Sequence, residues 1–554
     1  MATLSSFKRS DIGPKNPLIS ISKTTIESAF YGNNIIMIQS VSVAYQLAMQ
    51  SPGTVVTDLF VHRPEDLGLE QGSRVLLFND GEVTGRSAAA RRIVGEPDVS
   101  VDEYATIIRE AIYQTRFRNM YHAQSYAGLH EDFMVRNHLL IPEGFENVMY
   151  SWLLNFQPIT PEYRRMYDRS NKMKEPDIFI FSDPDWHDER FPMGLTYFDP
   201  LHNCAAILGM RYFGEFKKGT LTLVWGVANR NGFASCHGGQ KRYNMEDGTK
   251  AVIGVFGLSG SGKSTITHAK HDGKYDVTVL HDDAFVISTK DSSSVALEPS
   301  YFDKTSDYPC DCPDNQFLLT VQNCGATLDE DGKVVILAED VRNGNGRAVK
   351  SKLWTPNRID KFEEPVNAII WLMRDPTLPP VVKIEDPCFG SAFGATLATK
   401  RTSAERLAPG VDPNALVIEP YANPFRTYPL SEDFKKFKQL FAEKNVECYI
   451  LNTGFFMDKK IKKEITLDIL EQIIEKRAKF VNWKPFINLS IMDIDGFSPN
   501  MMDEKYVNHL KGRMKDRLLF IENRDTFKGG FDKLPVEAKE AMKKIVAEIE
   551  SWVI

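Results

Sequence analysis

The strongest chemical signal in the sequence is a glycine-rich motif, Gly257-Leu258-Ser259-Gly260-Ser261-Gly262-Lys263-Ser264. It matches G-x-x-x-x-G-K-[ST] at every fixed position, which is the pattern of a P-loop. In such a loop the glycines let consecutive backbone N–H groups point at a polyphosphate, the lysine reaches the β and γ oxygens, and the serine hydroxyl stands at the Mg²⁺ position. The motif therefore predicts a site for a nucleoside triphosphate and Mg²⁺.

The segments on either side of this motif have the patterns that a P-loop needs. Val252–Phe256 is an apolar run typical of a buried strand, and Ser264–Lys270 is compatible with a helix. A second apolar run, Val277–Leu280, ends in the pair Asp282-Asp283. An acidic residue after such a strand is where a metal-holding aspartate is expected. A chance Gly/Ser-rich loop would not have these flanks.

Other residues of catalytic type lie within a few tens of residues of the motif. Upstream are Tyr212, the pair Lys217-Lys218, and His237. A lysine pair is normally a solvated surface and a single histidine is normally structural, so these residues alone leave both interpretations open. Two arginines, Arg86 and Arg347, follow turn-like segments, and Lys304 follows the P-loop. Taken alone, none of these three residues indicates a functional site.

The elements that must position these residues follow from apolar periodicity. Helices are expected at 101–113, 145–155, 432–444, 465–476 and 536–552, and strands at 74–78, 177–182, 220–227, 332–337, 368–373 and 447–451. Residues 390–405 are small, polar and rich in glycine, which predicts a mobile loop or lid.

Composition excludes several classes of protein. The chain has 554 residues, 42% of them hydrophobic and 25% charged, which is enough for two or more lobes with large cores. A net charge of −7 without massed basic residues gives no indication of nucleic acid or anionic membrane as a partner. Seven irregularly spaced cysteines, and no long apolar run, predict a cytoplasmic protein.

From about Thr84 to Thr466 the chain resembles ATP-dependent phosphoenolpyruvate carboxykinase. Tyr212–Gly219 is similar to the family's Tyr-x-Gly-Glu-Met-Lys-Lys-Gly, and His237 follows Lys218 by the family's nineteen residues. Gly257–Thr265 resembles the family P-loop. Further matches, in order along the chain, are Thr84–Ser87, His281–Asp283, Glu298–Thr305, Asn345–Arg347, Leu378–Val381 and Asn452–Gly454.

The sequence also departs from the family pattern at three places. After Arg86 the family's Ser-Pro-Lys-Asp-Lys is replaced by Ser87-Ala-Ala-Ala-Arg91, so expected charges are missing. Leu397–Arg401 matches the family lid only loosely. On the adenine side, Lys460 stands where the family has an arginine, followed by Ile461, while Thr466 is retained.

The resemblance implies a two-lobed α/β fold with a P-loop nucleotide-binding C-terminal lobe. We expect an N-terminal, substrate-side lobe at 1–232 and a nucleotide- and metal-binding lobe at 233–554. Lys218 and His237 would then lie on opposite sides of the junction.

The resemblance also implies an activity: ATP-dependent decarboxylation and phosphorylation of oxaloacetate to phosphoenolpyruvate, ADP and CO₂, reversible, as in gluconeogenesis. Two negative groups then approach each other, and fixed cations must compensate their charge. The implied catalytic residues are Arg86 for a substrate carboxylate, Arg347 for substrate and γ-phosphate, Tyr212 for the CO₂ end, and Lys217, Lys218, Lys263 and Lys304. Gly257–Thr265, Arg347, Lys460, Ile461 and Thr466 would bind ATP.

The implied metal sites are Lys218, His237 and Asp283 for Mn²⁺, and Ser264 for the Mg²⁺ that accompanies ATP. A lysine binds metal only as the neutral amine, so the pKa of Lys218 must fall; burial beside Lys217 and a dication acts in that direction. Two alternatives remain open: a P-loop kinase of the same fold with a different acid or hydroxyl substrate, and a non-catalytic nucleotide sensor.

Overall fold

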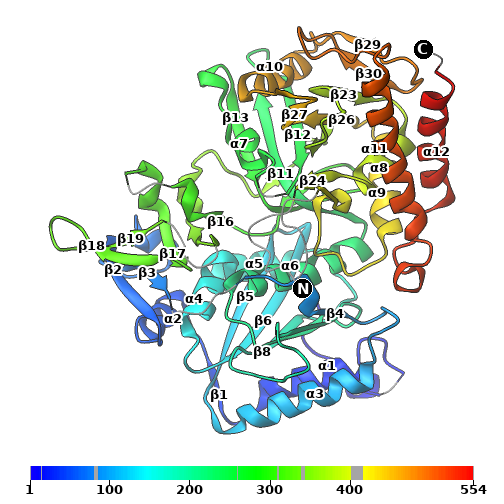
Figure 1. Cartoon of the computed structure of the whole chain (residues 1–554). Helices are drawn as coiled ribbons and strands as arrows, with labels where there is room; N and C mark the ends of the chain where they lie inside the picture. Colours follow the sequence, from blue (N-terminus) through cyan, green and yellow to red (C-terminus); the bar gives the residue numbers. More distant parts are fainter. Residues whose placement is uncertain are drawn as a thin grey trace. The chain divides into compact units, whose positions relative to one another are not determined.

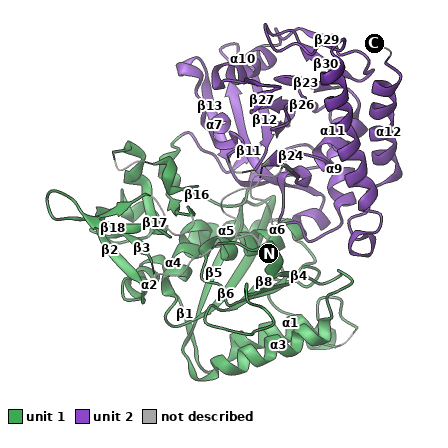
Figure 2. Ribbon diagram, viewed as in Figure 1, with its two compact units in different colours: residues 1–227, 296–356, 403–411 green, residues 228–295, 357–402, 412–554 purple. Residues whose placement is uncertain are grey.

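The computed structural model describes residues 2–13, 15–79, 85–258, 260–308, 311–338, 344–400 and 416–552. Its fold is mixed α/β, as predicted, and the chain forms two compact units (Figures 1 and 2). The described residues of the first unit fall within 1–227 and 296–356. Those of the second fall within 228–295, 357–402 and 412–554.

These units divide the chain differently from the predicted lobes at 1–232 and 233–554. Residues 296–356 group with the first unit although they follow the P-loop in the sequence. The substrate-side and nucleotide-side roles of the lobes stay predictions.

The first unit contains two main sheets. One has the order β1-β5-β6-β8-β10-β9-β4, with β7 paired to β5, and the other has the order β16-β20-β17-β3-β2. The strands of the first sheet are β1 (Ile35–Met37), β4 (Arg91–Ile93), β5 (Met120–His130), β6 (Phe133–Pro142), β7 (Gln157–Pro158), β8 (Ile178–Asp183), β9 (Leu195–Asp199) and β10 (Cys204–Leu208). Those of the second are β2 (Thr54–Phe60), β3 (Arg74–Phe78), β16 (Tyr301–Lys304), β17 (Leu318–Gln322) and β20 (Arg347–Lys350), beside the hairpin β18 (Gly325–Leu328) and β19 (Val334–Leu337).

The helices of the first unit begin where the sequence supplies caps. The hydroxyl of Ser100 accepts from the Glu103 N–H at the start of α3, and Thr160 caps α5 in the same way, with Pro161 at its first position. Tyr104, Ile107 and Ile108 of α3 pack into a core with α1 and the first sheet. The helices are α1 (Ile21–Ser28), α2 (Val41–Ala48), α3 (Val101–Gln114), α4 (Glu146–Asn155), α5 (Pro161–Arg169) and the first part of α6 (Phe213–Arg230).

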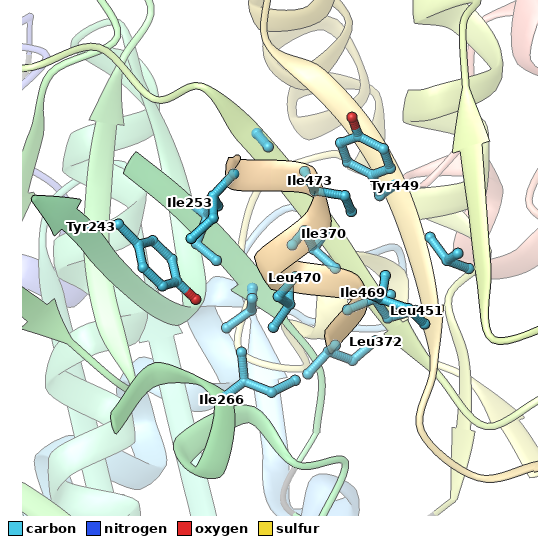
Figure 3. Close-up of a cluster of buried hydrophobic side chains, with 14 of the residues drawn as sticks. Tyr243, Ile253, Ile266, Ile370, Leu372, Tyr449, Leu451, Ile469, Leu470 and Ile473 are labelled. Atoms are coloured by element: carbon cyan, nitrogen blue, oxygen red, sulfur yellow. The ribbon is translucent and has the colours of Figure 1, made fainter. Parts of the chain in front are cut away.

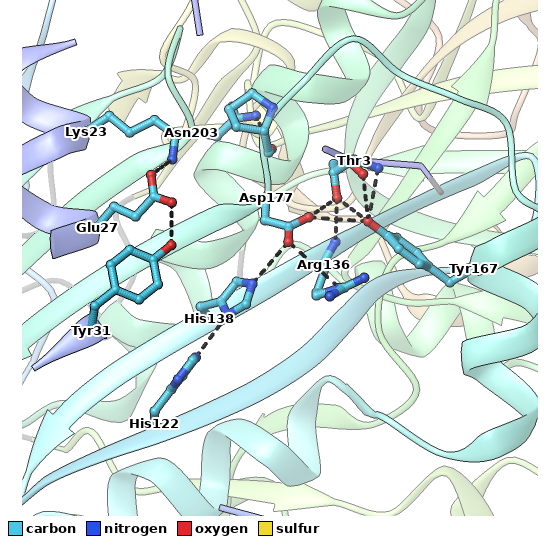
Figure 4. Close-up of polar contacts among 11 residues, drawn as sticks. Thr3, Lys23, Glu27, Tyr31, His122, Arg136, His138, Tyr167, Asp177 and Asn203 are labelled. Atoms are coloured by element: carbon cyan, nitrogen blue, oxygen red, sulfur yellow. Dashed lines mark hydrogen bonds and ion pairs between the residues drawn. The ribbon is translucent and has the colours of Figure 1, made fainter. Parts of the chain in front are cut away.

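A buried polar network fixes the N-terminal residues to this unit (Figure 4). Asp177 accepts from the hydroxyls of Thr3 and Tyr167, the latter at 3.3 Å, and lies 3.2 Å from His138 Nε2. His138 Nδ1 lies 2.9 Å from His122 Nε2. Burial, reinforced by His138, lowers the pKa of His122 to about 3, so this ring is neutral. The network satisfies polar atoms that would otherwise be costly to bury.

The second unit is built on one large sheet of order β21-β15-β14-β11-β12-β22-β26-β23-β30-β29, with β13 paired to β11. Its central strands β12, β22 and β26 are parallel neighbours and almost fully buried. The strands are β11 (Phe233–Asn244), β12 (Lys250–Phe256), β13 (Asp276–His281), β14 (Ala284–Ser288), β15 (Ser294–Ala296), β21 (Lys361–Phe362), β22 (Ala368–Met373), β23 (Val381–Ile384), β26 (Glu447–Asn452), β29 (Phe480–Asn482) and β30 (Leu489–Met492), with the hairpins β24 (Ala398–Lys400)–β25 (Leu416–Ile418) and β27 (Phe455–Phe456)–β28 (Lys459–Lys460).

An apolar core holds two helices of this unit against the sheet (Figure 3). Ile266 of α7 and Ile469, Leu470 and Ile473 of α10 pack against side chains of the central strands, among them Ile370. The helices are α7 (Lys263–His268), α8 (Pro387–Ala395), α9 (Leu430–Glu443), α10 (Lys463–Ile474), α11 (Glu504–Asn523) and α12 (Val536–Glu550). The core therefore fixes the helix that begins at the P-loop lysine.

Two predicted elements were wrong. Residues 220–227, predicted as a strand, belong to α6, whose side chains there are buried all round, so an apolar face cannot be recognised. The Thr220 hydroxyl donates to the Phe216 carbonyl at 2.9 Å, as in a buried helix. Within 390–405, predicted as a mobile loop, residues through Ala395 lie in α8 and are buried; the remaining part from residue 401 lies outside the described residues.

None of the described helices combines the length and the apolar character that crossing a membrane requires.

Candidate active site

The P-loop of the second unit follows β12 and leads into α7. Gly260 and Gly262 have φ values of 81° and 92°, a left-handed conformation that other residues adopt only with strain. A Cβ built on either glycine would meet nothing within 4 Å, so backbone conformation rather than crowding requires glycine there. Ser259 lies outside the described residues.

Two carbonyl groups of the loop are held by side chains from neighbouring strand ends. The Thr453 hydroxyl, which follows β26, donates to the Ser261 carbonyl at 2.7 Å. The Arg374 guanidinium, which follows β22, donates to the Gly260 carbonyl. Because β12, β22 and β26 are parallel, the segments after their last residues meet at one edge of the sheet, where ligands of α/β proteins commonly bind.

Of the remaining predicted P-loop residues, some pack in the interior and others are exposed. Leu258 is buried, and a Cβ on Gly257 would lie 2.9 Å from the Leu372 Cβ, so this glycine allows close packing against β22. Ser264 and Thr265, in the first turn of α7, are exposed. Their hydroxyl groups are therefore accessible to a ligand.

Three predicted residues meet at one carboxylate oxygen. Asp283 Oδ1 lies 3.2 Å from Lys263 Nζ and 3.0 Å from His237 Nε2. His237 Nδ1 donates to the Ala422 carbonyl, which can only accept, so the ring proton stands on Nδ1 and Nε2 faces the carboxylate. Metal-binding histidines are oriented by the same kind of hydrogen bond from the second nitrogen.

The neighbouring Asp282 has a structural role instead. It is buried and lies 3.4 Å from His268 Nε2 of α7. Burial raises the pKa of Asp282, but its ion pair with His268 and the nearby positive groups outweigh this and hold the pKa below its ordinary value. Of the acidic pair, Asp283 alone contacts the P-loop lysine.

The predicted adenine-side residues lie on a hairpin and the helix that follows it. Lys460 is exposed in β28, whereas Ile461 and Thr466 are buried. The Ile461 N–H donates to the Gly454 carbonyl at 3.0 Å, which fixes this segment to the loop after β26. Lys460 therefore contributes an exposed cation.

In the first unit, Lys304 and Arg347 are direct cross-strand partners on β16 and β20. Arg347 is buried, and Lys304 is half-buried. Burial lowers the pKa of Lys304, and the charge of Arg347 lowers it further. Two cations held side by side without full solvation are suited to an anionic substrate.

The start of α6 carries the other predicted residues of this unit. A Cβ on Gly214 would collide with the ring of Tyr212, which explains the glycine in that motif. Lys217 is fully buried and its Nζ lies 2.8 Å from Glu298 Oε1, so its charge is compensated by a carboxylate. Lys218 is half-buried, with Nζ 5.8 Å from the centre of the Trp225 ring. Lys217 thus has a structural partner that the sequence did not reveal.

Arg86 lies in a buried charged group with Arg91 and Glu215. Arg91 Nε lies 3.9 Å from Glu215 Oε1, and Arg91 also donates to the Thr222 hydroxyl at 2.6 Å. Burial raises the pKa of Glu215, opposed by the two arginines. Arg91 is the last residue of the segment 87–91, in which other charges of the family pattern are missing. This segment therefore still supplies one cation next to Arg86.

The predicted residues therefore form groups within each unit. His237, Lys263 and Asp283 come together in the second unit, whereas Lys218 belongs to the first, so the complete metal site stays a prediction. Among the described residues, no three His, Cys, Asp or Glu side chains form a metal-binding group. Sequence reasoning missed Arg374; its position directly after the predicted strand 368–373 was the available signal.

Comparisons with known proteins identify one family that the chain resembles. The sequence model of the phosphoenolpyruvate carboxykinase family matches residues 55–494. The chain is 25% identical over 344 residues to a phosphoenolpyruvate carboxykinase (ATP) of Aeropyrum pernix, covering 58% of this chain and 67% of the relative. A Bradyrhizobium protein of the same name is 23% identical over 405 residues, 69% of this chain and 71% of its own. One from Dictyostelium discoideum is 25% identical over 226 residues, 36% of this chain and 38% of its own.

Proposed function

The chain belongs to the phosphoenolpyruvate carboxykinase family, and from that premise we propose that it converts oxaloacetate and ATP to phosphoenolpyruvate, ADP and CO₂, reversibly. The observation that carries the proposal is the shared contact of Lys263 and His237 with Asp283 Oδ1. A P-loop kinase needs the lysine and the aspartate, but it has no need of a histidine nitrogen on the same carboxylate.

The nucleotide would be held by the P-loop of the second unit. Gly260 and Gly262 give the loop a conformation in which backbone N–H groups can surround phosphate, and Lys263 would contact the β and γ oxygens. Ile461 and Thr466 would lie on the adenine side, with Lys460 as an exposed cation beside them.

The residues present fit a divalent cation at His237 and Asp283. With its proton on Nδ1, His237 presents Nε2 to a carboxylate oxygen 3.0 Å away; two acceptors at that distance call for a cation or a proton between them. Lys218 would complete this Mn²⁺ site, and Ser264 would hold Mg²⁺; a nitrogen-rich ligand set suits Mn²⁺ better than Mg²⁺. A bound cation would compensate the negative charge shared by the phosphoryl group and the enolate.

On the substrate side, Arg86 would pair with a carboxylate of oxaloacetate, and Tyr212 would line the end from which CO₂ leaves. The bond between the leaving carboxylate and the adjacent carbon breaks, its electrons remain as an enolate, and the enolate oxygen attacks the γ-phosphorus as ADP departs. Arg347 and Lys304, side by side on their strands, would compensate charge on the phosphoryl group. No general base is needed.

The two alternatives are less well supported. Against a P-loop kinase of the same fold with a different acid or hydroxyl substrate, the matched relatives are each named phosphoenolpyruvate carboxykinase (ATP). The intact group of Lys263, His237 and Asp283 argues against a sensor without catalysis.

A coupled assay tests the proposal. Purified protein, oxaloacetate, ATP, Mg²⁺ and Mn²⁺ are expected to form phosphoenolpyruvate and ADP in equal amounts, faster with ATP than with GTP. A panel of other 2-oxo and hydroxy acids serves as the comparison. Consumption of ATP with another acid, together with no product from oxaloacetate, would replace this proposal by a kinase of different specificity.

A further inference from the structure

Arg374 contacts the phosphate loop but is not one of the predicted site residues. It directly follows β22, and its guanidinium donates to the Gly260 carbonyl. On its other side it borders the loop after β26: a Cβ built on Gly454 would lie 3.5 Å from both Cβ and Cγ of Arg374. The Gly454 carbonyl in turn accepts from the Ile461 N–H. The Arg374 side chain thus lies between the phosphate loop and the segment assigned to the base.

The charge of Arg374 is poorly compensated by the protein itself. Burial alone lowers its pKa, and no carboxylate of the described residues lies within ion-pair distance. Its Nε is buried and has no hydrogen-bond partner among the described residues. A half-buried cation with an unused donor is unfavourable unless an anion binds beside it.

Two more deeply buried arginines of this unit do have carboxylate partners. Arg517 is buried with NH2 2.9 Å from Asp375 Oδ2, and Arg426 has NH2 2.8 Å from Asp532 Oδ1. Each therefore serves the fold. Arg374 instead has a backbone carbonyl of the phosphate loop as its acceptor.

We propose that Arg374 binds the nucleotide, donating charge-assisted hydrogen bonds to a phosphate that is not transferred, the α- or β-phosphate. This inference rests on the proposed function for the identity of the nucleotide. Arg374 contacts Gly260, in the middle of the loop. The γ-phosphate is instead expected near Lys263, at the end of the loop, and Asp283, which contacts Lys263. A planar guanidinium can bind two oxygens of one phosphate in a fixed bidentate geometry, whereas a lysine ammonium acts as a point charge.

Direct binding measurements test the proposal without turnover. Calorimetric titration of the full chain with Mg-ATP and with Mg-ADP is compared between the parent, Arg374→Gln, Arg374→Lys and the control Arg477→Gln, an arginine in the same unit that pairs with Glu475. We expect Arg374→Gln to weaken ATP and ADP by a similar factor, roughly 10- to 100-fold. Arg374→Lys keeps the charge and should lose less, and the control should bind as the parent does.

Arg374→Lys keeps a charged donor near the Gly260 carbonyl but lacks the planar fork, so the three proteins together separate charge, bidentate phosphate binding and support of the loop. If Arg374→Gln binds both nucleotides within twofold of the parent, the proposal is wrong. A loss confined to ATP would also overturn it, because that result would assign Arg374 to the γ-phosphate.

Arginine modification in the unaltered protein provides a second measurement that does not depend on the folding of any variant. Phenylglyoxal labelling followed by peptide mass spectrometry should modify Arg374, and both ATP and ADP should protect it, whereas oxaloacetate should not. Labelling that neither nucleotide reduces would contradict the proposal.

The outcome for the proposed function is separate. If the parent forms phosphoenolpyruvate while Arg374→Gln binds ATP normally, the role of Arg374 fails and the function stands. If nucleotide binding depends on Arg374 and no phosphoenolpyruvate forms, the function fails and the role of Arg374 stands.

Discussion

Lys263 is the residue whose loss should affect phosphoryl transfer most. Its ammonium lies 3.2 Å from Asp283 and would stand over the β and γ oxygens. Lys263→Ala should reduce kcat by a factor of about a hundred or more, since removing one electrostatic contact in a catalytic site costs roughly 3–4 kcal/mol. The exposed Lys270→Ala is the matched control. Near-normal turnover of Lys263→Ala in the coupled assay would mean that the loop is structural.

Arg86 should separate the two substrates. Arg86→Gln is expected to raise KM for oxaloacetate far more than KM for ATP, because a buried arginine–carboxylate contact is worth roughly 2–5 kcal/mol. Steady-state kinetics with each substrate varied in turn measure this. Equal effects on both KM values would contradict the assignment of Arg86 to the substrate carboxylate.

At this scale, sequence reasoning found residues whose role depends on a motif and missed those whose role depends on neighbours. Lys263, His237 and Asp283 were predicted and do meet. The partner of Lys217 is Glu298, which is distant in sequence and follows from packing alone. Arg374 belongs to no predicted motif and becomes notable only when parallel strands bring it to the P-loop.

Among the elements, α7 depends on a glycine of the adjacent strand. A Cβ on Gly239 of β11 would collide with the Thr267 hydroxyl of α7. Gly239→Ala should therefore displace α7, weaken ATP binding and destabilise the protein by about 1–3 kcal/mol, the usual cost of overpacking. Gly512→Ala, in α11 with nothing within 4 Å, should stabilise it by roughly 0.5–1 kcal/mol. Thermal midpoints and ATP titrations of the two variants provide the measurement. Equal stability changes in both variants would contradict the close packing of Gly239 against Thr267.

Strand β11 also carries a lysine, Lys241, that contacts the end of α7, and its burial should make stability depend on pH. Lys241 Nζ donates to the Ala269 carbonyl at 3.1 Å and lies 3.4 Å from His271 Nε2. His271 in turn lies 3.0 Å from Glu471 Oε1. Burial lowers the pKa of Lys241 to about 7. The unfolded chain then binds more protons than the folded one above pH 7, so stability rises with pH up to the ordinary lysine pKa.

Lys241→Met keeps most of the volume and removes this titration. The variant should be more stable than the parent near pH 7, by an amount on the order of a few kcal/mol, and the difference should shrink towards pH 10. Thermal midpoints of both proteins across this range provide the measurement. A difference that does not change with pH would show that Lys241 stays charged in the folded protein.

Elements with a clear apolar pattern were predictable. The strand at 368–373 is β22, and the helices at 101–113 and 536–552 are α3 and α12 with small shifts at their ends. The segment 220–227 was not, because a helix buried on every side has no polar face to mark its period. The glycines of 390–394 suggested mobility, but they allow α8 to pack closely: a Cβ on Gly394 would lie 2.7 Å from the Trp371 ring.

For the whole molecule, the compact units predict which fragments fold. A fragment of residues 1–232 lacks β17, the parallel partner of β3, and Glu298, the partner of Lys217. It should be insoluble or lack a cooperative thermal transition. A chain in which 1–227 is joined to 296–356 by a flexible linker restores both partners and should melt cooperatively. Circular dichroism on both decides; a cooperative transition of the 1–232 fragment would contradict the division into units.

The pairing of β3 with β17 can form only after both strands have been synthesised on the ribosome. Leu76 of β3 pairs with Thr320 of β17, about 240 residues later in the chain. At roughly 5 to 20 residues per second, their synthesis is separated by tens of seconds. During that interval the apolar strand Arg74–Phe78 can pair with β2 alone, and its other edge has no partner. The nascent chain should therefore depend on chaperones that bind exposed strand edges, and slower translation should increase aggregation of this protein.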